Sequence, residues 1–142
     1  PKSLVIAVVG DGGFQMTLYE LSTVMLYKLP VKIVILDNKY LGMVRQWQEL
    51  FFDNRLSGVD LDHSPDFVKL AQSYGVKGVR IKNARTCRHK LREAFDYPGP
   101  VLIHAEVIKE DNVFPMIPAG QAADAMILER PDTPMEKPTG ST

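Results

Sequence analysis

The chain has 142 residues, a typical length for one domain with its own core. Its 17 basic and 17 acidic residues give a formal net charge of zero, so no global field attracts nucleic acid or an anionic membrane surface. The longest apolar runs are far shorter than the roughly 20 residues that span a bilayer, so we predict neither a membrane nor a nucleic-acid partner.

The amino-terminal part of the sequence predicts two strands with a helix between them. Residues 4–9 form a continuous, largely β-branched apolar run, which is typical of a strand buried on both faces. Apolar side chains then recur every three or four positions and predict a helix over residues 15–28, which Pro30 ends. Residues 31–36 form a second buried strand, and residues 37–39 follow it as a polar turn.

The elements continue to alternate toward the carboxyl end. A helix is predicted over residues 41–51, and another begins at Ser64-Pro65 with the serine as its cap. A short strand, a helix and a last strand follow at residues 79–81, 87–95 and 101–107. This alternation predicts an α/β fold with an open, mainly parallel sheet and helices on both faces. Ligands of such sheets bind beyond the carboxyl ends of the strands.

The last part of the sequence differs in composition. From Lys109 onward there are few apolar repeats, and prolines recur at positions 115, 118, 131, 134 and 138. We therefore predict an α/β domain at residues 1–108 and an extended, proline-rich arm at residues 109–142.

The glycine-rich turn after the first strand is the first candidate site. Gly10-Asp11-Gly12-Gly13 connects a buried strand to a helix, and its glycines let backbone N–H groups approach a phosphate closely. An aspartate here would repel a bare phosphate unless a cation lies between the two. Asp11 therefore predicts Mg²⁺ or a similar hard ion.

Asn38 ends the second strand, 27 positions after Asp11. One strand-helix-strand crossover returns the chain to the same edge of the sheet, so we expect the two side chains to meet. Their oxygens, a backbone carbonyl just after Asn38, water and two phosphate oxygens would complete an octahedral shell for Mg²⁺. Either half alone is also an ordinary turn pattern, so the hypothesis depends on their joint occurrence.

Other polar patterns predict no chemistry. The G-x-G-x-x-G pattern is not met and no Walker lysine follows, which argues against dinucleotide binding and a P-loop. His63, His89 and His104 have no ligand-like spacing, so we expect them to be surface or structural histidines. The basic cluster at residues 85–92 has no interleaved aromatic residues and is typical of a solvated helix face.

The Gly-Asp-Gly turn followed by Asn38 after an apolar strand resembles the motif of thiamine-diphosphate enzymes. Segments of this sequence then resemble the catalytic subunit of the acetolactate synthase family, at residues 10–16, 41–48, 65–71 and 112–118. The Met-Val-Arg-Gln-Trp-Gln and Asn-Val-Phe-Pro-Met segments resemble its biosynthetic, flavin-containing branch in particular. Asp37 departs from the family pattern, in which asparagine is common at that position.

The resemblance implies a role for each residue of the candidate site. Asp11 and Asn38 would supply side-chain oxygens to Mg²⁺, and Tyr40 a main-chain oxygen. Thiamine diphosphate would bind along the two segments that carry these ligands, at Gly10, Asp11, Gly12, Gly13, Asn38, Tyr40, Leu41, Gly42 and Met43. Met43 and Trp47 would border the substrate channel, although a Met and a Trp four positions apart on a helix more often pack in a core.

The resemblance also implies a reaction. Pyruvate would be decarboxylated on thiamine diphosphate, and its two-carbon unit joined to a second pyruvate or to 2-ketobutyrate in branched-chain amino acid biosynthesis. The complete enzyme would contain FAD, form a homodimer or homotetramer, and bind a regulatory small subunit. The single cysteine, Cys87, cannot form an internal disulfide, so we expect a reducing compartment such as the bacterial cytoplasm or the plastid stroma.

In this family, the glutamate that activates the cofactor lies on a different domain, and no segment here resembles it. We therefore expect no catalytic residue within this chain, no activity of the chain alone, and the remaining domains of a longer or multi-chain enzyme as partners. Two alternatives stay open. The chain could belong to another thiamine-diphosphate enzyme, such as pyruvate oxidase, glyoxylate carboligase or benzoylformate decarboxylase, or it could be a noncatalytic module that retains the fold.

Overall fold

The structure, a computed structural model, describes residues 3–132. These residues form two compact units, the first made of residues 3–39 and 62–109 and the second of residues 40–61 and 110–132. The predicted boundary between residues 108 and 109 remains a prediction, and residues 133–142 of the predicted arm lie outside the described residues.

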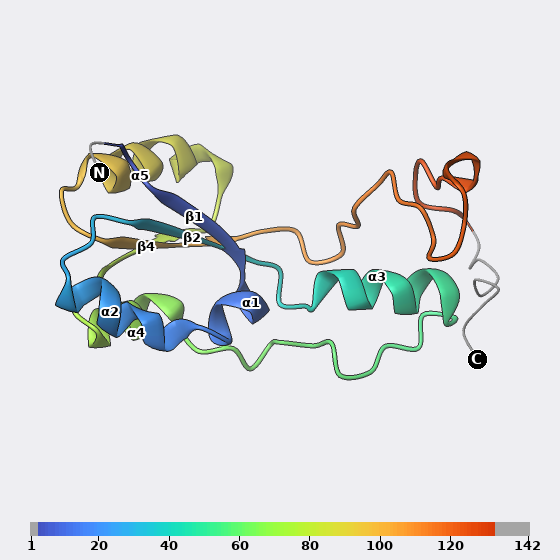
Figure 1. The fold of residues 1–142 in the computed structure, drawn as a ribbon, viewed down its shortest axis with the longest axis horizontal. Helices are drawn as coiled ribbons and strands as arrows, with labels where there is room; N and C mark the ends of the chain where they lie inside the picture. The colour runs from blue at the N-terminus through green and yellow to red at the C-terminus, as the bar shows by residue number, and fades with distance from the viewer. Residues whose placement is uncertain (1–2, 133–142) are drawn as a thin grey trace. The chain divides into compact units, whose positions relative to one another are not determined.

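The first unit is built on a four-stranded sheet (Figure 1). Its strands along the chain are β1 (Ile6–Gly10), β2 (Lys32–Asp37), β3 (Lys77–Ile81) and β4 (Val101–Glu106). Their order across the sheet is β1-β2-β4-β3, and every neighbouring pair runs parallel. The carboxyl ends of the strands therefore share one edge of the sheet, and the predicted α/β fold is confirmed.

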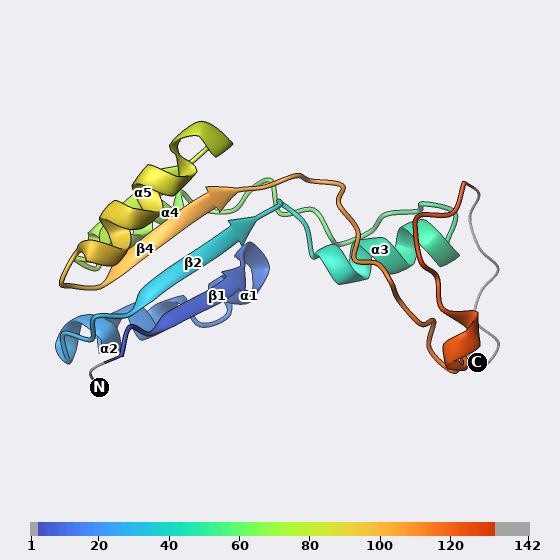
Figure 2. The same ribbon diagram turned by 90° about the horizontal axis from the view of Figure 1, so that it is seen from above.

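Helices lie on both faces of this sheet (Figures 1 and 2). One face carries α1 (Asp11–Gln15), α2 (Leu21–Leu26) and α4 (Phe67–Ser73), and the other carries α5 (Ala84–Asp96). Each face has its own apolar core. The first contains Phe14, Leu21, Ile33, Ile35, Phe67, Ala71, Val76 and Leu102, and the core under α5 contains Ile81, Ala94, Val101 and Ile103.

The strand β1 lies at the edge of the sheet, so the prediction that residues 4–9 are buried on both faces is wrong. Ile6 and Val8 are 43% and 64% exposed, and Leu36 on β2 is 42% exposed. Their register places these side chains on the face that carries α5, but α5 packs on β3 and β4 (Figure 2). Among the described residues no helix covers β1 on that face, so its apolar side chains stay exposed.

The helix predicted over residues 15–28 is interrupted, and helical structure begins before it. The helix α1 ends at Gln15, and the 3₁₀ helix η1 (Leu18–Glu20) and α2 follow. The interruption lies at Thr17, whose φ of −135° is outside the helical range. Apolar spacing predicts which side chains face the core, but it does not detect this local change of backbone conformation.

The helix predicted to begin at Ser64-Pro65 is α4, and it begins at Phe67. Its cap is Asp66, whose carboxylate accepts hydrogen bonds from the N–H groups of Val68 at 3.0 Å and Lys69 at 3.2 Å. A carboxylate that accepts two N–H groups satisfies more of the helix end than a serine hydroxyl two positions earlier.

The second unit contains α3 (Gly42–Phe51), the 3₁₀ helix η2 (Ala123–Ala125) and irregular segments. Gln46 of α3 is 1% exposed, and its amide group binds both the carbonyl and the N–H of Val113. Its Nε2 donates to the Val113 carbonyl, and its Oε1 accepts from the Val113 N–H, both at 2.9 Å. The N–H groups of Met116 and Ile127 donate to each other's carbonyls at 2.9 and 2.8 Å. Within residues 110–132, Val113 is thus hydrogen-bonded to α3, and Met116 is hydrogen-bonded to Ile127.

Gly78 on β3 provides a test of the packing between the sheet and α4. A Cβ at this position would lie 2.8 Å from Cγ1 and 3.0 Å from the carbonyl oxygen of Val68. Because one of these atoms is backbone, α4 would have to shift. We expect Gly78→Ala to destabilise the protein by about 1–3 kcal/mol, measured as a lower midpoint of thermal unfolding. Gly10→Ala is the matched control, because a Cβ there meets no atom within 4 Å; equal midpoints for the two variants would contradict the predicted contact.

Candidate functional site

Asp11 lies at the carboxyl end of β1, where it is the first residue of α1. It is 1% exposed, and its Oδ2 has no hydrogen-bond partner among the described residues. Burial and, after it, the neighbouring Asp37 raise the pKa of Asp11 from 3.8 to about 6. A buried carboxylate oxygen without a donor destabilises the fold, and a bound cation would remove that penalty.

Asp37, the last residue of β2, forms a buried cluster beside Asp11. Its Oδ2 lies 2.6 Å from Nε2 of His104 and 2.7 Å from Nζ of Lys39. Burial alone would raise the pKa of Asp37, but hydrogen bonds from Lys39 and His104 hold it below its usual range. Asp37 therefore places a second negative charge at the carboxyl edge of the sheet.

The sequence prediction misses this cluster. It places Asp37 in a polar turn, whereas Asp37 belongs to β2 and is 2% exposed. His104 is a structural histidine, one of the two alternatives predicted, since it is 3% exposed and bonded to Asp37, but the sequence does not identify this partner. Alternation along β2 puts Ile35 and Asp37 on one face, and Ile35 pairs with His104. This pairing register would have predicted the contact between Asp37 and His104. It could not be used from the sequence alone, because it requires knowing that β2 pairs with β4.

Asn38 directly follows Asp37 and is half-buried. Gly10 pairs with Leu36 in the sheet, so the turns that carry Asp11 and Asn38 leave the same edge. Gly12 and Gly13 lie in the first turn of α1. The space beside Gly10 is open, because a Cβ there would meet no atom within 4 Å. Asp11, Asn38 and the glycines at positions 10, 12 and 13 therefore lie along one edge of the sheet, and there is room for a ligand beside Gly10.

Tyr40 to Met43 belong to the second unit. Tyr40 forms an isolated antiparallel bridge with Asp60, and its ring centroid lies 4.9 Å from Cζ of Arg45. The N–H of Leu41 donates to the carbonyl of Val59 at 2.9 Å, and α3 begins at Gly42. Asp11 and Asn38 thus belong to the first unit, where they follow neighbouring strands at one edge of the sheet, and Tyr40, Leu41, Gly42 and Met43 belong to the second.

Met43 and Trp47 lie on α3. Met43 is 55% exposed, so within the second unit it is not a core residue. Trp47 is half-buried and packs against Phe51, with ring centroids 4.9 Å apart. Met43 therefore has a side chain that is free to contact a ligand, while the packing of Trp47 is compatible with both of its predicted roles.

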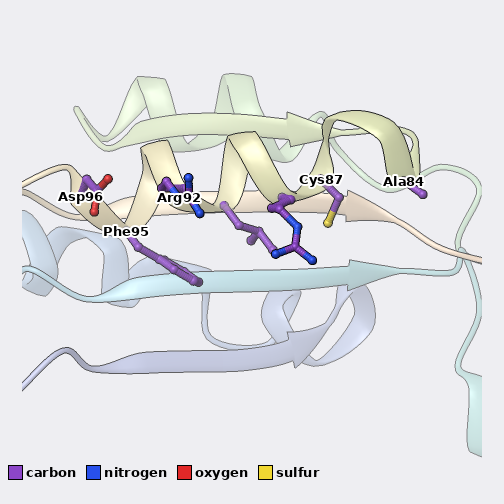
Figure 3. A pocket seen from close by; sticks show the side chains of 7 residues that line it. Ala84, Cys87, Arg92, Phe95 and Asp96 are labelled. Atoms are coloured by element: carbon purple, nitrogen blue, oxygen red, sulfur yellow. The ribbon is translucent and has the colours of Figure 1, made fainter.

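An open hollow of about 670 Å³ lies beside α5 in the first unit (Figure 3). It is lined by Ala84, Cys87, Arg88, Leu91, Arg92, Phe95 and Asp96. Figure 3 shows Cys87 and Phe95 directed from α5 toward the sheet. None of the predicted site residues lines this hollow, and every lining residue belongs to α5. The hollow is thus separate from the candidate site.

Two further features of residues 3–132 concern metal-binding side chains and apolar helices. No three or more His, Cys, Asp or Glu side chains are grouped so that they could hold a metal ion. The predicted set of Asp11, Asn38 and Tyr40 is of a different kind, because it combines one carboxylate with an amide and a main-chain oxygen. No helix in the same residues is long and apolar enough to cross a membrane.

The comparison with protein families gives one match. Residues 1–105 match the model of the thiamine pyrophosphate enzyme C-terminal TPP-binding domain. This match covers β1, β2, β3, all of β4 except Glu106, and both turns of the candidate edge.

Similar proteins include several acetolactate synthase subunits. The large subunit of Porphyra purpurea is 43% identical over 128 residues, which are 89% of this chain and 22% of that protein. The isozyme 2 large subunit of Escherichia coli (strain K12) is 42% identical over 92% of this chain and 24% of that protein. The mitochondrial catalytic subunit of Saccharomyces cerevisiae is 45% identical over 93% of this chain and 19% of that protein. The chain thus spans only 19–24% of the length of these relatives.

A solved structure is also similar. It is the thiamine diphosphate-dependent 4-hydroxybenzoylformate decarboxylase of Rhodococcus jostii RHA1, with a TM-score of 0.71 and 30% sequence identity. The similarity covers 78% of this chain and 21% of that one. The same arrangement of strands and helices thus occurs in an enzyme whose name includes the cofactor.

Proposed function

Because this chain belongs to the thiamine pyrophosphate enzymes, as their C-terminal TPP-binding domain, we propose that it is the part of an acetolactate synthase that holds the cofactor diphosphate. The observation that carries this proposal is the buried, unpartnered Oδ2 of Asp11 at the carboxyl edge of the sheet. A cation bound there would satisfy this oxygen and neutralise the charge that repels a diphosphate.

The side chains of Asp11 and Asn38 and the main-chain oxygen of Tyr40 would hold Mg²⁺. Gly10, Gly12 and Gly13 would let the backbone approach the diphosphate, since no side chain intervenes. Leu41, Gly42 and Met43 would contact the rest of the cofactor. When bound, thiamine diphosphate supplies the electron sink for decarboxylation of a 2-keto acid. The residues of this chain would position the cofactor and exclude water from it.

The substrates would be two 2-keto acids, pyruvate and either a second pyruvate or 2-ketobutyrate. Met43 and Trp47 would border their channel, and the exposure of Met43 supports this role. The chain would depend on the remaining domains of the same enzyme for the activating glutamate and for FAD. The complete enzyme would be a homodimer or homotetramer with a regulatory small subunit, in the bacterial cytoplasm or the plastid stroma.

Product analysis of the protein expressed from its complete gene tests this proposal. With pyruvate, thiamine diphosphate, Mg²⁺ and FAD, we expect 2-acetolactate as the main product, and 2-aceto-2-hydroxybutyrate when 2-ketobutyrate is added. Omission of thiamine diphosphate is the control and should abolish both products.

The alternative products would identify a different enzyme. Acetyl phosphate or acetaldehyde as the sole product would refute the synthase and favour an oxidase or a simple decarboxylase, and turnover of an aromatic 2-keto acid would favour the activity in the name of the Rhodococcus jostii protein. Absence of any product together with absence of cofactor binding would favour a noncatalytic module.

A further inference from the structure

A buried hydrogen bond joins Asp37, the last residue of β2 and the neighbour of Asn38, to β4. Nε2 of His104 lies 2.6 Å from Oδ2 of Asp37. Because an ionised carboxylate only accepts, Nε2 carries the hydrogen and donates it. The imidazole is also fixed by packing, since its centroid lies 5.3 Å from the ring of Phe67 in an edge-to-face arrangement. His104 therefore presents its donor to Asp37 from a rigid position.

Every oxygen of Asp37 accepts a hydrogen bond. Oδ2 accepts from His104 and from Nζ of Lys39, and Oδ1 accepts from the N–H of Lys39 at 3.2 Å. The carbonyl oxygen accepts from the N–H of Val107 at 3.1 Å, which extends the pairing of β2 with β4. These hydrogen bonds fix the Asp37 side chain and backbone, and they stabilise a carboxylate that is buried beside the carboxylate of Asp11.

These contacts fix the turn that carries Asn38. Lys39 has a φ of 63°, in the left-handed region that non-glycine residues rarely adopt. Its N–H and its ammonium group both bind the Asp37 side chain, which stabilises this conformation. Asn38 lies between the two residues, so its backbone direction is set by the position of Asp37.

We propose that His104 is a positioning residue for the cofactor site. Its hydrogen bond holds Asp37 in place, and Asp37 fixes the turn that directs the Asn38 side chain toward the Mg²⁺ ion proposed at Asp11. This inference rests on the proposed function. His104 would touch neither metal nor cofactor, and it would act through the hydrogen bond to Asp37. Ligand-orienting residues of this kind typically change metal affinity by roughly 10–100-fold.

The test compares two substitutions of His104 in the protein expressed from its complete gene. His104→Phe keeps a ring beside Phe67 but removes the donor, whereas His104→Gln keeps an N–H donor of similar reach. We measure the Kd of thiamine diphosphate at fixed Mg²⁺ by calorimetry, well below the unfolding temperature of each variant. We expect His104→Phe to raise the Kd at least tenfold and His104→Gln to restore it to within about threefold of the unsubstituted protein.

A stability control separates positioning from a merely structural role. Val101→Ala removes buried volume from the same strand on the opposite face and should lower the unfolding temperature without changing the Kd. Should His104→Phe not fold, His104→Leu replaces it, because it also removes the donor to Oδ2 and leaves the contacts of Lys39 with Asp37 in place. An unchanged Kd in the donor-free variant, or a Kd equally raised in His104→Gln, would overturn the inference. If the unsubstituted protein itself binds no cofactor, the proposed function fails and this inference fails with it.

Discussion

Replacing Asp11 with alanine is expected to weaken the binding of thiamine diphosphate and Mg²⁺ by at least about 100-fold, which corresponds to about 2.7 kcal/mol. Asp11 is the buried carboxylate at the carboxyl edge of the sheet, and its Oδ2 has no other partner among the described residues. Under the proposed function, Mg²⁺ would then lose a charged ligand, and the diphosphate would lose the cation that links it to the protein. Isothermal calorimetry of the protein expressed from its complete gene measures the loss.

The matched control for this substitution is Asp96→Ala. It removes the same charge from an exposed position on α5, outside the candidate site, and should leave the affinity unchanged. A separate variant, Gly10→Ala, tests the open space beside the turn: its Cβ meets no protein atom, so it should weaken binding only if the diphosphate lies there. Equal affinities of Asp11→Ala and the unsubstituted protein would remove Asp11 from the site and leave the metal hypothesis without its main ligand.

Much of the sheet and one edge of the site can be predicted from local patterns. The β-branched apolar runs that become β1 and β2 indicate parallel strands, and crossover spacing places Asp11 and Asn38 at one edge. The burial of β1 cannot be read in the same way, because it depends on whether another element covers that face. Its apolar run predicts a covered strand, while Val8 is 64% exposed in the described chain.

The contacts that the sequence does not predict are those between distant segments. Asp37 and His104 are 67 positions apart, as are Gln46 and Val113. Asp37 meets His104 because β4 pairs with β2, and Gln46 meets Val113 because the segment after β4 packs against α3. A single sequence contains no direct signal for such pairings between distant segments. The cap of α4 is a local case, in which Ser64 and Asp66 are both suitable residue types and the choice depends on which side chain reaches the free N–H groups.

Asp11 is also expected to destabilise the protein when no cation is bound. Burial first, and then Asp37, raise the pKa of Asp11 from 3.8 to about 6. Since the folded-state pKa is the higher one, the folded form binds the proton more tightly than the unfolded form does. The stability linked to this group is therefore fully present below about pH 4 and is lost as the pH rises to about 6.

The substitution Asp11→Asn tests this expectation because asparagine has a similar shape and cannot ionise. Without Mg²⁺ and cofactor, the variant should be more stable than the unsubstituted protein at pH 7 and nearly equal to it at pH 4. The measurement is hydrogen exchange of the β2 and β4 amides in the protein expressed from its complete gene. It gives the free energy of local opening around this site. Saturating Mg²⁺ and thiamine diphosphate should reverse the order at pH 7, since only the unsubstituted protein binds them tightly. A variant less stable than the unsubstituted protein at pH 7 without cation would show that the backbone hydrogen bonds of the Asp11 carboxylate outweigh its burial, and that these bonds rather than a cation account for its place in the fold.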